Sequence, residues 1–280
     1  MEKILFNGKF IEQRPHVDIE DRGYQFGDGI YEVVGIYNYK LYLLNEHLDR
    51  LKQSAYKIEL DLPFSLKEIK AQLLELVQFN QVKEGLVYLQ VSRGVAPREH
   101  ELPVNPINPV VVAYTKTLGD LTELQKNGAS AILEEDIRWL RCDIKSLNLL
   151  PNTMAKQRAI EQNAIEAILH RGETITEASA SNVFIVKKGE VYTHPVNNYI
   201  LNGITRQKII ELCHKLSIPI HEKTYTIQQL MDADEIFITA TKIDVVAINE
   251  VDGHIIGTGH PGELSRQLLT EIRKDTDLIQ

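Results

Sequence analysis

The chain has 280 residues, of which 43% are hydrophobic and 25% are charged, and its formal net charge is −8. These values are typical of a soluble globular protein with one large domain or two smaller ones. The negative charge argues against a general electrostatic grip on nucleic acid, and no stretch approaches the ~20 apolar residues of a membrane span. Two distant cysteines, Cys142 and Cys213, predict neither a zinc site nor a disulfide framework. We expect no metal and a reduced, cytoplasmic compartment.

The first part of the chain predicts two hairpins and two helices. Asn7-Gly8 between short apolar runs is a strong hairpin signal, and Asn38-Tyr39 separates two further strand-like runs. Asn45 is expected to cap one helix, and residues 65–68 form a capping box that opens another helix through Val77. The expected strands are 4–6, 10–11, 31–37, 41–44, 86–92 and 110–114.

Residues 115–124 are polar and rich in turn formers, so we expect an N-terminal domain, 1–118, and a C-terminal domain, 119–280, which contains Lys145. The glycines of 257–262 match a dinucleotide-binding pattern, but only 18 residues follow them, too few for the βαβ unit it requires. We expect a C-terminal helix there instead. The mixture of strands and helices without βαβ alternation predicts an α+β fold. The further expected elements are strands 129–133 and 235–239, a hairpin of 183–186 with 190–193, and helices 153–163 and 205–216.

Three segments carry groups suited to an anion. Residues 201–206 (Leu-Asn-Gly-Ile-Thr-Arg) form a tight turn leading into a helix, whose first free N–H groups can bind an anion. Arg50 shares a helix face with His47. Arg98 and His100 project to one side of an extended segment, which suits a carboxylate. Taken singly, each has an ordinary explanation as a capped helix start or a solvated surface charge.

Lys145 follows a run, 139–144, that is apolar enough to bury it, and a buried lysine can become a Schiff-base nucleophile. Its segment, Cys-Asp-Ile-Lys-Ser-Leu-Asn, resembles the lysine segment of the fold-type IV pyridoxal-phosphate (PLP) enzymes. Residues 177–184 resemble their E-x-x-x-S-N-x-F segment, and 201–206 resemble their L-x-G-I-T-R phosphate turn. Residues 21–32, with the Arg98/His100 pair, resemble the bacterial D-amino-acid aminotransferases. The similarity covers essentially the whole chain.

The resemblance implies two α+β domains with PLP between them. Lys145 would carry the cofactor and move protons, and Glu177 would keep the pyridine nitrogen protonated so that the ring acts as an electron sink. Arg138 would approach the cofactor from further out. The resemblance implies further cofactor contacts from Arg50, Leu201, Ile204, Thr205 and Thr241. It implies that the substrate carboxylate is held by Tyr31, Arg98 and His100, the last two from the partner subunit of a homodimer.

The implied reaction moves the amino group of a D-amino acid, such as D-alanine, to 2-oxoglutarate, giving pyruvate and D-glutamate. Ala180 and Ala240 replace serines of better-known members, and each change removes a hydroxyl donor worth ~1 kcal/mol. Three alternatives use the same scaffold: a branched-chain L-amino-acid aminotransferase, an aminodeoxychorismate lyase and a non-catalytic PLP-binding protein. The Arg98/His100 pair favours the D-specific enzyme, because it puts a carboxylate trap on a distinct side of the pocket.

Overall fold

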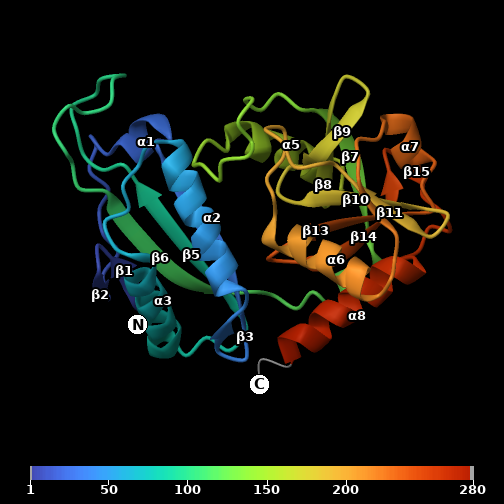
Figure 1. Ribbon diagram of the computed structural model, residues 1–280, viewed down its shortest axis with the longest axis horizontal. Helices are drawn as coiled ribbons and strands as arrows, with labels where there is room; N and C mark the ends of the chain where they lie inside the picture. Colours follow the sequence, from blue (N-terminus) through green and yellow to red (C-terminus); the bar gives the residue numbers. More distant parts are fainter. Residues whose placement is uncertain (1, 278–280) are drawn as a thin grey trace. The chain divides into compact units, whose positions relative to one another are not determined.

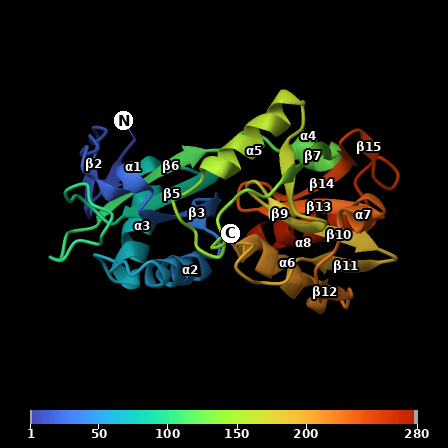
Figure 2. The same ribbon diagram turned by 90° about the horizontal axis from the view of Figure 1, so that it is seen from above.

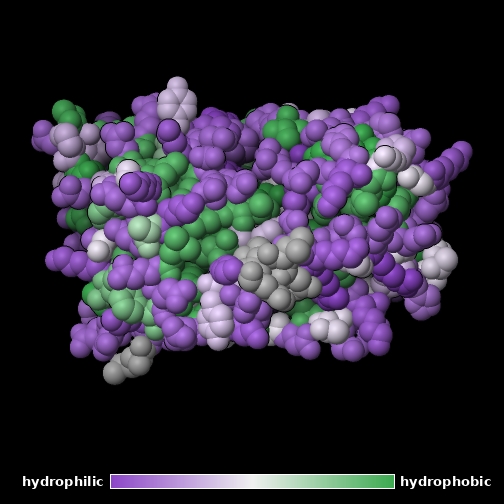
Figure 3. Space-filling view, turned by 60° about the horizontal axis from the view of Figure 1, so that its bottom comes forward, coloured by the Kyte–Doolittle hydropathy of each residue, from purple (hydrophilic) through white to green (hydrophobic). Residues whose placement is uncertain are grey.

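The computed structural model describes residues 2–277, which divide into two compact units. Unit 1 contains the residues through Leu118, the segment Ile144–Asn148 and the chain from Thr276; unit 2 contains Gly119–Asp143 and Leu149–Asp275. Each unit combines a sheet with helices (Figure 1), so the predicted α+β fold is confirmed. Hydrophilic side chains surround smaller hydrophobic patches on the face drawn in Figure 3. Within 2–277, every helix is too short or too polar to span a bilayer.

Unit 1 is built on a six-stranded antiparallel sheet with the order β2-β1-β6-β5-β3-β4. Helices α2 and α3 cover one face of this sheet, as Figures 1 and 2 show. The apolar side chains between this face and the helices are fully buried, among them Val34 of β3, Leu51 of α2 and Leu73 of α3. The elements of unit 1 are β1 Ile4–Phe6, β2 Lys9–Ile11, α1 Arg22–Phe26, β3 Gly29–Tyr37, β4 Lys40–Leu41, α2 Leu44–Lys57, α3 Leu66–Asn80, β5 Gly85–Ser92 and β6 Val110–Thr117.

Both predicted hairpins of unit 1 are present, and so is the capping box at the start of α3. The predicted start of α2 is wrong. The helix begins at Leu44 with Leu43 as its N-cap, whereas Asn45 lies inside the helix and accepts a hydrogen bond from Lys70 Nζ at 2.8 Å. Starting two residues earlier buries Leu44 in the core, and this apolar contact outweighs the capping preference of asparagine.

Unit 2 is built on a nine-stranded mixed sheet. Its path is β12-β11-β10-β13-β14-β7-β8-β9, with β15 added beside β14. Helices α6 and α8 pack against β10, β13 and β14 through one buried cluster that includes Phe184 and Phe237. The elements of unit 2 are α4 Thr122–Asn127, β7 Ala129–Glu135, α5 Leu150–Glu161, β8 Glu166–Arg171, β9 Thr174–Ala178, β10 Asn182–Lys187, β11 Glu190–Thr193, α6 Ile204–Lys215, β12 Ile220–Glu222, α7 Ile227–Met231, β13 Glu235–Ala240, β14 Asp244–Val251, β15 His254–Ile255 and α8 Glu263–Asp277.

Most of the expected elements of unit 2 are present. The β10–β11 hairpin turns at Lys188 and Gly189 as predicted, and the C-terminal helix α8 follows Gly262. Helix α5 begins earlier than expected, at Leu150, because Pro151 occupies its first turn, where proline's missing N–H costs nothing. Strands β8, β9 and β14 were not predicted; most of their residues are buried, so they lack the alternation of a half-exposed strand.

Candidate active site

Lys145 lies in a short extended segment that pairs with the start of β3. The Tyr31 N–H donates to the Lys145 carbonyl at 3.0 Å, and Ile30 and Ser146 form an antiparallel bridge. The Lys145 ammonium lies 4.2 Å from the centre of the Tyr31 ring, within cation–π range. The lysine is half-buried, so it is more accessible than the apolar run before it suggested. These contacts bring Lys145 and Tyr31 together. The segment Ile144–Asn148, which contains Lys145, groups with unit 1, whereas the predicted domain boundary after residue 118 put Lys145 in the C-terminal domain.

Arg50 and His47 share a face of α2, as predicted, and both bind the carboxylate of Glu32 on β3. Arg50 donates from Nε to Oε1 at 2.7 Å and from Nη2 to Oε2 at 2.8 Å, and His47 Nδ1 lies 2.7 Å from Oε2. Burial raises the pKa of Glu32, but the charge and hydrogen bonds of Arg50, helped by His47, bring that pKa down to about 2. Glu32 is therefore an ionised, fully buried anchor that fixes the direction of the Arg50 guanidinium.

Arg98 and His100 are both exposed and lie against one aromatic ring. The Arg98 guanidinium carbon is 5.0 Å from the centre of the Phe26 ring, and the His100 ring centre is 5.8 Å from it. Both side chains thus lie near Phe26, although the segment bends at Arg98 and at His100 and is not the extended strand that the prediction assumed. Their aromatic contacts within residues 2–277 are with Phe26, whereas the Tyr31 ring stacks on Tyr88 with its centre 5.7 Å away. Their role towards a substrate stays a prediction.

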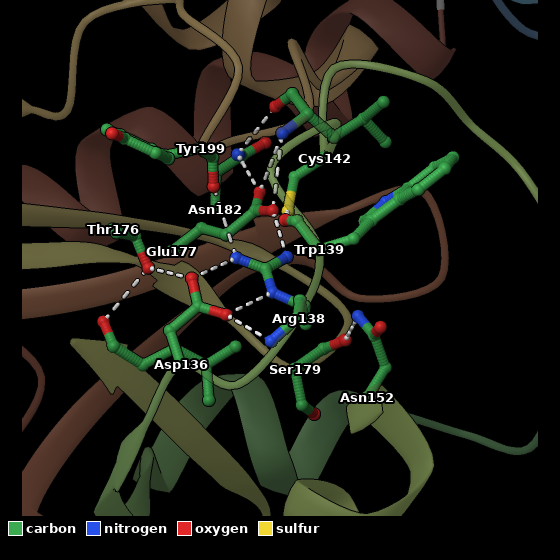
Figure 4. Close-up of polar contacts among 12 residues, drawn as sticks. Asp136, Arg138, Trp139, Cys142, Asn152, Thr176, Glu177, Ser179, Asn182 and Tyr199 are labelled. Carbon is green, nitrogen blue, oxygen red and sulfur yellow. Dashed lines mark hydrogen bonds and ion pairs between the residues drawn. The ribbon is translucent and has the colours of Figure 1, made fainter. Parts of the chain in front are cut away.

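Glu177, near the end of β9, is the buried carboxylate of unit 2 on which several donors converge (Figure 4). Arg138 Nη1 donates to Oε1 at 2.5 Å, Asn182 Nδ2 donates to Oε2 at 3.0 Å, and the Leu201 N–H lies 3.1 Å from Oε2. Burial raises the pKa of Glu177, while the charge of Arg138 and the hydrogen bonds work against that rise. The donors orient the carboxylate and favour its ionised form.

The guanidinium of Arg138 lies between the carboxylates of Glu177 and Asp136 and donates hydrogen bonds to both. Its Nε and Nη2 donate to Asp136 at 2.8 and 2.9 Å, on the side away from Nη1 and Glu177. Asp136 Oδ2 also accepts hydrogen bonds from Thr176 at 3.0 Å and from Arg171 at 3.1 Å. Burial lowers the pKa of Arg138, but the charges of Glu177 and Asp136 have the larger, opposite effect, so the pKa lies above its ordinary value. The arginine is therefore a permanently charged clamp on Glu177.

Asn182 joins the glutamate segment to the turn before α6. Its Nδ2 donates both to Glu177 and, at 2.9 Å, to the Leu201 carbonyl. Gly203 is the N-cap of α6, and a Cβ atom there would lie 2.2 Å from Asn182 Oδ1. The close approach requires glycine. The helix begins at Ile204 and Thr205, so the N–H groups of its first turn lie where the sequence predicted an anion site.

Two buried polar atoms in these segments have no hydrogen-bond partner among residues 2–277. They are Arg206 Nε, in the first turn of α6, and Thr239 Oγ1, on β13 opposite Asn182. Both residues are 1% exposed. Thr241 follows the end of β13 in the turn before β14, at the place expected for a phosphate contact. Native proteins rarely leave buried polar atoms unpaired, so these two point to a ligand of this region.

The sequence interpretation missed four residues of this constellation. Glu32 and Asn182 stand within motifs that were recognised, but no role was assigned to either. His47 was noted only as a neighbour of Arg50 on a helix face, and Thr239 stands two residues before Thr241 in a strand that was predicted. Their burial and partners depend on strand pairing, which periodicity does not reveal.

The comparisons with known proteins decide the family. A family model described as amino-transferase class IV matches residues 29–251. The chain belongs to this family. The matched region contains the pairs Lys145–Tyr31 and Glu177–Arg138.

Several known proteins are similar in sequence to this chain over nearly its full length. A D-alanine aminotransferase of Bacillus licheniformis is 50% identical over 272 residues, which are 97% of this chain and 96% of that protein. One of Listeria innocua is 51% identical and covers 95% of this chain and 93% of that protein. One of Staphylococcus aureus is 47% identical and covers 96% and 95%.

Solved structures of the family share the fold. A branched-chain aminotransferase of Thermoproteus uzoniensis, solved with norvaline, is 26% identical, with a TM-score of 0.87 over 98% of this chain and 94% of that one. A branched-chain enzyme of Escherichia coli is 22% identical, with a TM-score of 0.92 over 98% and 94%. A third branched-chain enzyme was solved with N-(5'-phosphopyridoxyl)-L-glutamate; it is 24% identical, with a TM-score of 0.86 over 98% and 93%. These likenesses confirm the α+β fold.

Proposed function

We propose that this class IV aminotransferase moves the amino group of D-alanine, or a similar D-amino acid, to 2-oxoglutarate, giving pyruvate and D-glutamate. The observation that carries this proposal is the near-full-length similarity to D-alanine aminotransferases, at about twice the identity of the branched-chain structures. The paired Arg98 and His100 support it, because a guanidinium and an imidazole suit a substrate carboxylate.

The residues present fit PLP, the cofactor of the reaction. Its phosphate would be held by Arg50, the first turn of α6 at Ile204 and Thr205, and the Thr241 hydroxyl. The unpaired Thr239 Oγ1 and Arg206 Nε, buried in the same segments, are the structural observation that favours a bound group there. Lys145 and Arg50, in unit 1, and Glu177, in unit 2, would also contact the cofactor, and Leu201 would pack on its ring.

Bound PLP supplies an aldehyde that takes up the substrate's amino group and a ring that withdraws electrons from the substrate α-carbon. Glu177 holds a proton on the pyridine nitrogen, because a carboxylate fixed by Arg138 and Asn182 stabilises the positive charge there. Lys145 Nζ would hold the cofactor covalently and, when free, would act as the base that moves the proton at the substrate α-carbon. The Tyr31 ring, 4.2 Å from Nζ, lies beside the amine that would do this.

Chirality follows from the side on which the carboxylate is held. If Tyr31, Arg98 and His100 bind the carboxylate on one side of the pocket, the α-hydrogen of a D-amino acid would face Lys145 and that of its L-enantiomer would not. We propose that Arg98 and His100 serve the Lys145 of the partner subunit in a two-fold homodimer. Both side chains are exposed, and both contact Phe26, whereas Lys145 contacts Tyr31. These observations support the arrangement. Two free buried cysteines suit a reducing, cytoplasmic setting.

A substrate panel tests the proposal. The purified holoenzyme is assayed with 2-oxoglutarate and, in separate reactions, D-alanine, L-alanine and L-leucine, and then with aminodeoxychorismate alone. We expect pyruvate and D-glutamate from D-alanine at a kcat/KM at least a hundredfold above that for either L-amino acid. Faster turnover of L-leucine would make the protein a branched-chain enzyme. Release of pyruvate from aminodeoxychorismate would make it a lyase, and cofactor binding without turnover of any donor would make it a binding protein.

A further inference from the structure

Arg22, in the short helix α1, is a buried arginine for which the proposed reaction has no direct use. It is 4% exposed, although arginine is rarely buried without a specific set of acceptors. Its Nε donates to Asp28 Oδ2 at 2.8 Å, and its Nη1 donates to the backbone carbonyls of Glu99 at 2.7 Å and Glu101 at 3.3 Å. All of these groups lie in unit 1.

The two carbonyls that Arg22 binds flank His100 in the chain. The segment that carries Arg98 and His100 has no helix or strand of its own, so its backbone depends on contacts such as these. The Arg22 guanidinium carbon also lies 4.8 Å from the centre of the Phe26 ring, the ring that Arg98 and His100 contact. One buried side chain therefore touches both the backbone of this segment and the ring against which its side chains rest.

We propose that Arg22 is a positioning residue that presets Arg98 and His100 for the substrate carboxylate. The inference rests on the proposed function, because it takes these two side chains as the carboxylate trap. A guanidinium suits the task, since Nε and Nη1 reach Asp28 and the two carbonyls from two atoms in a fixed plane, whereas a lysine would have to reach all three from one nitrogen. Side chains that are already held in the binding position lose little conformational entropy when the substrate binds. Arg22 therefore acts on substrate affinity.

Arg93 offers a matched comparison within the same unit. It is also nearly buried, and its Nε donates to the same Asp28 Oδ2 at 2.8 Å. Its remaining nitrogens donate to the carbonyls of Glu59 and Ile58 at 2.8 and 2.7 Å, on a different loop. Arg22 and Arg93 thus share a carboxylate and a pattern of contacts, but only Arg22 reaches the segment with Arg98.

The test compares Arg22→Lys with Arg93→Lys in the holoenzyme. For Arg22→Lys we expect the KM for D-alanine to rise about tenfold or more, with kcat within about twofold and an unchanged PLP dissociation constant, since small misplacements of binding groups weaken binding steeply. The dissociation constant of D-lactate, a carboxylate without an amine, should rise in parallel by calorimetry. Arg93→Lys should lower the melting temperature about as much as Arg22→Lys does. It should leave the KM for D-alanine and the dissociation constant of D-lactate unchanged.

Equal effects of the two variants on KM would show that Arg22 is merely structural, and so would an unchanged KM in Arg22→Lys; either result overturns the inference. Amide hydrogen exchange of residues 98–102 separates this inference from the proposed function. We expect faster exchange in Arg22→Lys, and not in Arg93→Lys, even if D-alanine is not a substrate. Unchanged exchange in Arg22→Lys overturns the inference. If Arg22→Lys does not fold, Phe26→Leu takes its place. It removes the shared ring and should raise the KM, and an unchanged KM counts against the preset trap.

Discussion

At the scale of single residues, two buried glutamates beside arginines have pKa values that move in opposite directions. The pKa of Glu32 falls to about 2, whereas the pKa of Glu177 rises. Burial raises the pKa of both carboxyls. At Glu32 the effects of Arg50 and His47 together outweigh burial, whereas at Glu177 burial prevails over Arg138, and the charge of Asp136 raises the pKa further. Arg50 gives two hydrogen bonds to Glu32, while Arg138 gives one hydrogen bond to Glu177 and two to Asp136. Glu177 is thus less fully compensated, and a positive pyridine nitrogen would complete its set of partners.

Replacing Glu177 by glutamine tests that interpretation. An amide keeps the hydrogen bonds in part but carries no charge to stabilise a protonated ring nitrogen. We expect the rate of the half-reaction with D-alanine to fall on the order of 100-fold, as for other electrostatic contacts aimed at developing charge. The melting temperature should change little, because Arg138 retains Asp136. Stopped-flow absorbance measures the rate, and a wild-type rate would mean that Glu177 does not serve the ring.

At the scale of elements, the sequence predicted those that depend on local chemistry. The Asn7-Gly8 hairpin, the capping box at Ser65 and the start of α6 follow from backbone preferences of a few neighbouring residues. The start of α2 and strand β8 depend on burial against distant residues, which no local pattern contains. For the same reason the motifs could indicate Glu177 and Arg98, but not Arg22 or Asn182.

The turn before α6 allows a prediction at this scale. In Gly203→Ala the new methyl group would collide with Asn182 Oδ1, so Asn182 would lose its contacts with Glu177 and Leu201. We expect the PLP dissociation constant to rise about tenfold or more, equivalent to about 1.4 kcal/mol. The overpacked site should also cost ~1–3 kcal/mol of stability. Titration of the apoprotein with PLP measures the first effect, and denaturant unfolding measures the second.

Gly119→Ala is the control, because a Cβ atom at this position meets nothing within 4 Å. It should leave both quantities unchanged. If Gly203→Ala binds PLP as tightly as the wild type does, the turn is not part of the phosphate site.

At the scale of the whole molecule, the Glu32 cluster makes stability depend on pH. The folded pKa of Glu32, about 2, lies below its ordinary value of 4.5. The unfolded chain therefore binds more protons between these values, and stability present above pH 4.5 is lost as the pH falls towards 2. The shift corresponds to about 3 kcal/mol. Burial also lowers the pKa of His47 from 6.5, so its contribution begins to be lost below pH 6.5 in the same direction.

Urea unfolding between pH 7 and pH 3 measures this effect. We expect the free energy of unfolding of the wild type to fall more steeply below pH 4.5 than that of Glu32→Gln. Glu46→Gln, an exposed change on α2 next to His47, should retain the wild-type slope. Equal slopes in the wild type and in Glu32→Gln would show that Glu32 is not held in its ionised form.

The proposed shared site of the homodimer predicts complementation. Lys145→Ala and Arg98→Ala should each be severely impaired. After subunit exchange of equal amounts, about half of the dimers are hybrids, each with one intact site of two, so roughly a quarter of the wild-type activity should return. If hybrids form and activity stays at the level of the separate variants, each trap is made within one chain.

The central claim is that Lys145 carries out amino transfer from D-alanine. The most direct measurement mixes the wild-type holoenzyme with D-alanine, without 2-oxoglutarate, and follows both the absorption band of the bound cofactor and the pyruvate released. We expect the band to disappear with about one pyruvate per subunit, no change with L-alanine, and neither band nor pyruvate from Lys145→Ala, since only its amine can bind the cofactor covalently. A persistent band without pyruvate in the wild type, or wild-type turnover by Lys145→Ala, would contradict the account.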